Sequence, residues 1–121
     1  MGCCINNLDS IEYAKSLTDI INIIYYDKNL FNIQLDIMKK DKNLPQEAKI
    51  QKINYLSIVI EKLQIYINYL NERNKKYPYI TDLEITELKI NYKSLLSNLD
   101  SMNYKNTNNY FDNFETVLYD L

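Results

Sequence analysis

The sequence predicts an all-α protein, a small antiparallel bundle of four to five helices. The main observation is that apolar residues recur at alternating spacings of three and four in three separate stretches, which places them on one side of a helix. A second observation is that 121 residues with 46% hydrophobic content provide for one core. We therefore expect a flexible N-terminus over residues 1–7 and a single domain over residues 8–121. The three stripes are Ile53, Leu56, Ile60, Leu63, Ile67 and Leu70; Ile85, Leu88, Tyr92, Leu95, Leu99 and Met102; and Phe111, Phe114, Leu118 and Leu121.

The first 40 residues predict two helices separated by a polar break. The first helix is expected from residue 7 or 9 to about residue 27, and the sequence Asp-Lys-Asn at 27–29 predicts the break. Residues 30–40 then predict a second helix, although residues 33–37 also alternate as a strand would. We favour the helix because a lone strand cannot satisfy its backbone hydrogen bonds. The expected face of the first helix consists of Tyr13, Leu17, Ile20 and Ile24, widened by Ala14 and Ile21.

A long central helix is expected over about residues 45–74. Pro45 suits the first turn of a helix, and Pro78 follows its predicted end. Thr81 and Glu84 form the pattern of a capping box, which predicts that the next helix covers residues 81–102. Because the connector is short, these two helices are predicted to pair as an antiparallel hairpin. A final helix is expected from about residue 109 to the C-terminus.

The composition excludes several classes of enzyme. The only glycine is Gly2 and there is no histidine, so glycine-rich phosphate loops, His-activated nucleophiles and the usual zinc sites are excluded. The helically spaced acids at 84 and 87, and at 112 and 115, are typical of a solvated face. Cys3 and Cys4 are adjacent and have no third cysteine or histidine with which to hold a metal. We therefore expect no enzyme activity, no metal and no cofactor.

Charge argues against nucleic acid as a partner, because the net charge is −2 and the pI is about 5.1. It is unevenly distributed, since residues 39–76 carry nine bases and four acids while the regions on both sides are acidic. The favoured interpretation is a basic central helix between acidic neighbours. The alternative is a patch that binds an anionic ligand or lipid phosphates.

The N-terminal sequence supplies a second hypothesis. Gly2, Cys3 and Cys4 resemble the start of dually acylated eukaryotic proteins, which implies a myristoyl chain on the glycine and a palmitoyl chain on a cysteine. Asn6 departs from the Ser or Thr of that pattern. The competing interpretation is an unmodified start with two incidental thiols. The protein would bind a membrane only if it is acylated, and otherwise we expect it in the cytoplasm.

Tyrosine is the most abundant aromatic residue, with twelve against three phenylalanines. One interpretation of this content is AT-rich coding, and the other is a binding surface, because tyrosines at helix ends are typical of protein-binding surfaces. We therefore predict a non-catalytic protein-binding module, an inhibitor or adaptor that acts by steric occlusion, in the size and helical style of immunity proteins and phage anti-defence proteins. Alternatives are a lipid-anchored adaptor and an oligomeric sponge for an anionic nucleotide, and a homodimer through a helical face is also expected. The predicted partner-binding residues are Tyr25, Tyr26, Lys39, Lys40, Lys42, Tyr77 and Tyr79.

Overall fold

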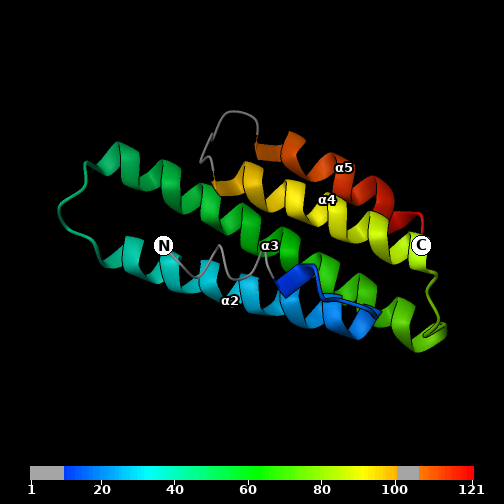
Figure 1. The fold of residues 1–121 in the computed structure, drawn as a ribbon. Helices are drawn as coiled ribbons and strands as arrows, with labels where there is room; N and C mark the ends of the chain where they lie inside the picture. The colour runs from blue at the N-terminus through cyan, green and yellow to red at the C-terminus, as the bar shows by residue number, and fades with distance from the viewer. Residues whose placement is uncertain (1–9, 101–106) are drawn as a thin grey trace.

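The protein is an all-α bundle, as the stripes predict. The computed structural model describes residues 10–100 and 107–121, and all regular secondary structure in these residues is helical. Figure 1 shows that successive helices run in opposite directions along the bundle. They are α2 (Leu17–Lys40), α3 (Gln46–Lys76), α4 (Asp82–Asp100) and α5 (Thr107–Tyr119).

The first helix begins later and continues further than the sequence predicts. Ser16 is the N-cap of α2, since its hydroxyl accepts a 3.1 Å hydrogen bond from the Asp19 amide. The predicted break at residues 27–29 is wrong, because α2 passes through it to Lys40. Asp27 is buried in the middle of the helix and accepts a hydrogen bond from Tyr92 of α4. A partner 65 residues away thus stabilises a segment that looks like a loop locally.

The bundle contains two close helix pairs. The backbones approach most closely between α2 and α3 and between α4 and α5. The predicted pairing of α3 with α4 holds in direction, because the two are antiparallel and joined by residues 77–81 (Figure 1). They also touch, since the Tyr55 hydroxyl donates a 2.6 Å hydrogen bond to the Leu99 carbonyl. The α2–α3 hairpin extends past the ends of α4 and α5, so its turn projects from the bundle (Figure 1).

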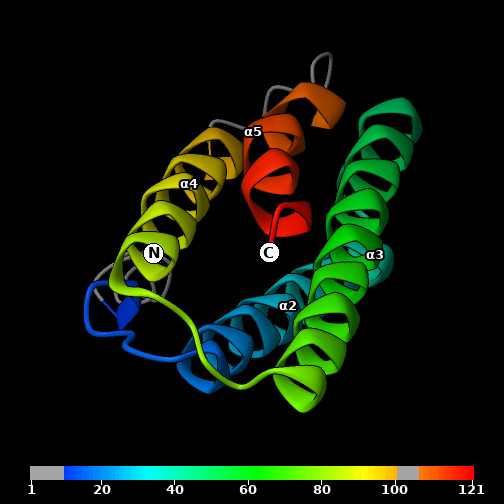
Figure 2. The same cartoon turned by 90° about the vertical axis from the view of Figure 1, so that its right-hand side faces the viewer.

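Residues 10–16 form a short docked segment instead of the first turns of the predicted helix. Figure 2 shows this segment between α2 and α4, where it closes one side of the bundle. Ile11 and Ala14 are buried, whereas Tyr13, which was expected on the buried face, is 78% exposed. Lys89 donates a 2.7 Å hydrogen bond to the Glu12 carbonyl, and Lys93 pairs with the Glu12 carboxylate. These contacts fix the segment to α4.

The core follows the predicted stripes. All the described stripe residues of α4 are buried, and Met102 lies outside the described residues. At the centre, Tyr66 of α3 lies against Phe114 of α5 with ring centroids 5.1 Å apart, and Tyr92 of α4 lies 5.6 Å from the same ring. Aromatic side chains from three helices therefore meet in the middle of the molecule. The fully buried stripe residues are Leu56, Leu63, Leu70, Leu88, Tyr92, Phe111, Phe114 and Leu118.

Candidate functional site

The predicted partner-binding residues do not form one surface. Lys39 and Lys40 end α2 and Lys42 lies in the turn that follows, whereas Tyr77 and Tyr79 lie in the connector after α3. The 31 residues of α3 separate these two ends by about 46 Å at 1.5 Å per residue. A single compact partner surface cannot cover both groups.

Tyr25 and Tyr26 lie between the two ends, on α2, and each is about half exposed. The Lys28 ammonium lies 4.8 Å from the centre of the Tyr25 ring and also donates a 2.7 Å hydrogen bond to Gln64 of α3. Lys28 therefore contacts the Tyr25 ring within α2 and also connects α2 to α3. Tyr26 belongs to a different surface of α2.

The connector at residues 77–81 is organised by Arg73, the only arginine of the chain. Its guanidinium donates to the backbone carbonyls of Tyr77 and Tyr79, the latter at 3.1 Å. Its Nε donates a 3.2 Å hydrogen bond to the Leu121 carbonyl after α5. The planar guanidinium group of Arg73 thus holds the connector against the end of α5.

The two tyrosine side chains of the connector point outward although their backbone is held. Tyr77 is 57% exposed and Tyr79 is 71% exposed. Their rings are 5.4 Å apart in an edge-to-face arrangement, and the Arg73 guanidinium lies 5.1 Å from the centre of the Tyr77 ring. We call Tyr77 and Tyr79 the connector tyrosines. They are the predicted site residues that the structure does bring together.

The predicted capping box fixes the far side of the connector. The Thr81 hydroxyl accepts from the Glu84 amide at 3.1 Å, and the Thr81 amide donates to the Glu84 carboxylate at 2.9 Å. The hydrogen bond from the Thr81 backbone, and next that from its hydroxyl, hold the pKa of Glu84 below its ordinary value. The connector tyrosines are therefore held between Arg73 on one side and the first turn of α4 on the other.

Inside the bundle, two tyrosine hydroxyls each donate a hydrogen bond to a carboxylate. The Tyr92 hydroxyl donates a 2.6 Å hydrogen bond to Asp27, and the Tyr66 hydroxyl donates to Glu115, which also pairs with Lys62 at 2.9 Å. Burial first, and the neighbouring carboxylate second, raise the pKa of both tyrosine hydroxyls. Both hydroxyls are thus neutral hydrogen-bond donors at neutral pH, which suits a structural role better than acid–base chemistry.

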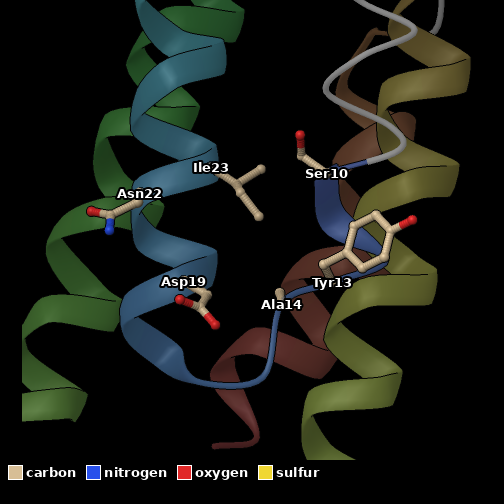
Figure 3. Close-up of a pocket in the computed structure, with 6 residues that line it drawn as sticks. All are labelled: Ser10, Tyr13, Ala14, Asp19, Asn22 and Ile23. Atoms are coloured by element: carbon tan, nitrogen blue, oxygen red, sulfur yellow. The ribbon is translucent and has the colours of Figure 1, made fainter.

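A pocket of about 380 Å³ lies between the docked segment and α2. Figure 3 shows Ser10, Tyr13 and Ala14 on one side of it and Asp19 and Ile23 of α2 on the other. Asp19 is the only charged residue in its lining, so an anionic nucleotide would meet a negative charge there. Sequence reasoning missed this pocket because it predicted that residues 9–27 form one continuous helix.

The described residues contain no group of His, Cys, Asp or Glu side chains that could hold a metal ion. No helix in the described part of the chain combines the length and the apolar character that crossing a bilayer requires. Gly2, Cys3 and Cys4, on which the acylation hypothesis depends, lie outside the described residues.

Comparison of the chain with models of protein families, with curated protein sequences and with solved structures found no significant match in any of the three.

Proposed function

We propose that the protein is a non-catalytic binding module that recognises another protein through the connector tyrosines. The observation that carries this proposal is that Arg73 fixes the backbone of both residues while leaving both rings exposed. Exposed tyrosines on a fixed backbone lose little conformational entropy on binding, which is why such side chains dominate many recognition surfaces. The expected location is the cytoplasm.

The chemistry of the site indicates the kind of surface it would recognise. A tyrosine ring fills an apolar pocket, and its hydroxyl donates a hydrogen bond at the end of that pocket. Lys75 and Lys76 are exposed at the adjacent end of α3, and basic side chains at the rim favour an acidic partner. The expected partner is thus a protein with an apolar pocket surrounded by carboxylates. Binding there would place the whole bundle over the partner's surface, which is the action of a steric inhibitor or adaptor.

The test compares matched tyrosine variants. Tagged wild-type protein, Tyr79→Ala and Tyr13→Ala are used to capture partners from the native host's lysate, and affinity is then measured with the purified partner. Tyr13 is a suitable control because it is even more exposed than Tyr79 but lies on the docked segment. We expect Tyr79→Ala to raise Kd by about 30-fold or more, as truncation of a central aromatic contact does. Tyr13→Ala should bind as the wild type does.

If Tyr79→Ala and Tyr77→Ala each bind the partner as tightly as the wild type does, the proposal is contradicted. Circular dichroism should confirm that all variants keep the helical content of the wild type, so that a loss of binding reports on the surface.

A further inference from the structure

The outer surface of α2 carries a seven-residue stripe, which we call the α2 seam; its Ile23 packs against the core, whereas Tyr26, Ile33 and Ile37 are exposed among the described residues. Its residues recur at alternating spacings of four and three over three full heptads. Tyr26, Ile33 and Ile37 are 53%, 55% and 62% exposed, and Leu30 between them is partly exposed. The seam consists of Asp19, Ile23, Tyr26, Leu30, Ile33, Ile37 and Lys40.

From the seam we infer that two copies of this chain form an antiparallel dimer through α2. The stripe has the spacing of a coiled-coil contact, and in either direction it consists of five apolar residues between two charged residues of opposite sign. With a twofold axis at Leu30, Ile23 of one copy faces Ile37 of the other, and Ile33 lies one residue from the position that faces Tyr26. Lys40 likewise lies one residue from the position that faces Asp19, so the two charged ends of the seam come close to each other.

The charges around the seam also favour a second copy over a charged partner. Between residues 20 and 35 of α2 the only charged side chains are Asp27 and Lys28. Asp27 is buried and accepts from Tyr92, while Lys28 is bonded to Gln64 of α3. The central part of the seam therefore presents an uncharged, apolar surface that does not repel an identical one. Two parallel copies would instead place Lys40 beside Lys40.

The pocket beside the docked segment fits the end of a second α2. Asp19 and Ile23, the first two residues of the seam, line this pocket of about 380 Å³ together with Ala14 and Tyr13 (Figure 3). In the antiparallel alignment Ile37 of the other copy lies against Ile23, where apolar atoms of the pocket can contact it. Its Lys40 ammonium then lies beside the Asp19 carboxylate. One pocket on each copy would thus receive one helix end from the other.

In the described part of the chain, the projecting hairpin exposes the C-terminal half of the seam. Figure 1 shows that the C-terminal part of α2 and the following turn extend past α4 and α5. Ile33 and Ile37 lie on this part, which explains why the fold leaves them exposed. The seam is distinct from the connector tyrosines, so the dimer and the proposed partner surface are independent of each other.

The first test is the mass of the full-length protein in solution, measured by light scattering at about 10 to 100 μM. The dimer predicts twice the chain mass of 14.5 kDa. Ile37→Glu places a carboxylate in the partner's pocket beside Asp19 and should give a monomer. Ile90→Glu is the matched control, because Ile90 is 61% exposed but lies on α4 outside the seam. A monomeric wild type, or an Ile37→Glu protein that remains dimeric, would overturn the inference.

The second test examines the antiparallel alignment. Lys40→Glu places like charges against Asp19 in its own dimer, and Asp19→Lys does the same against Lys40. In the antiparallel dimer each single variant turns both Asp19–Lys40 pairs into like charges, so its Kd should be about tenfold higher than that of the wild type. In a parallel dimer the wild type already places Lys40 beside Lys40 and Asp19 beside Asp19, so a Kd equal to that of the wild type would overturn the antiparallel register. Circular dichroism of each variant checks that the fold is kept.

Membrane binding supplies the competing outcome. If the wild type is monomeric and binds vesicles of phosphatidylserine and phosphatidylcholine, and Ile37→Glu abolishes that binding, the seam is a lipid-binding face and the dimer is wrong.

Discussion

The hydroxyl of Tyr92 on α4 donates a 2.6 Å hydrogen bond to the carboxylate of Asp27 on α2, and both residues are buried. This pair links the two halves of the bundle, because α2 packs closely with α3 and α4 packs closely with α5. It also explains how a charged residue occupies the buried face of α2. A buried polar group is tolerated when its hydrogen bonds are made inside the protein.

The first prediction concerns this pair. Tyr92→Phe removes the hydroxyl and keeps the ring, so the Asp27 carboxylate loses one donor in a buried environment. We expect the free energy of unfolding in urea to fall by about 1 to 3 kcal/mol. Tyr119→Phe removes a hydroxyl from a half-exposed ring and should change stability by less than about 0.5 kcal/mol. Equal stability of Tyr92→Phe and wild type would show that the hydrogen bond is energetically neutral.

The second prediction is a loss of stability at alkaline pH. The pKa values of Tyr66 and Tyr92 are raised above the ordinary value of 10.0, by burial first and by their carboxylate partners second. In the unfolded chain both hydroxyls ionise near pH 10, while in the fold they keep their protons. The unfolded state therefore binds fewer protons above pH 10, and folding stability decreases as pH rises.

This effect can be measured by urea unfolding between pH 9 and 11. Each of the two tyrosines should contribute a slope of up to about 1.4 kcal/mol per pH unit once pH exceeds 10. Tyr92→Phe should lower the slope, because one such group is missing. A slope identical to that of the wild type would contradict the raised pKa of Tyr92.

The stripes and the capping box were sufficient to predict α3, α4 and α5, because these signals are local. Thr81 and Glu84 are three residues apart and bond to each other as predicted. The continuous α2 was missed because Asp27 and Lys28 are stabilised by Tyr92 and Gln64, which are distant in sequence. A usable signal existed for the start of α2, since Ser16 followed by Asp19 is the pattern of an N-cap. Nothing local in the sequence indicates the contacts of Arg73.

The third prediction concerns the start of α4. Thr81→Ala removes the hydroxyl that accepts from the Glu84 amide, which should destabilise the protein by about 1 kcal/mol. Thr86→Ala is the control, because Thr86 is exposed inside the same helix, where alanine is a better helix former than threonine. Urea unfolding should show a loss for the first variant and no loss for the second. If both variants are destabilised to the same extent, the lost N-cap hydrogen bond is not the cause of the lower stability of Thr81→Ala.

The fourth prediction separates the positioning of the connector tyrosines from their contacts. Lysine at position 73 keeps the positive charge but cannot donate to the carbonyls of Tyr77, Tyr79 and Leu121 together. We expect Arg73→Lys to reduce the protection of the connector amides in hydrogen exchange and to lower stability by about 1 kcal/mol. Affinity for the partner should fall about tenfold, because the binding tyrosines are less well ordered before binding. Lys76→Arg keeps the charge at an exposed position of the same helix and serves as the control. If Arg73→Lys loosens the connector while the affinity stays the same, the tyrosines do not bind the partner as a preorganised pair.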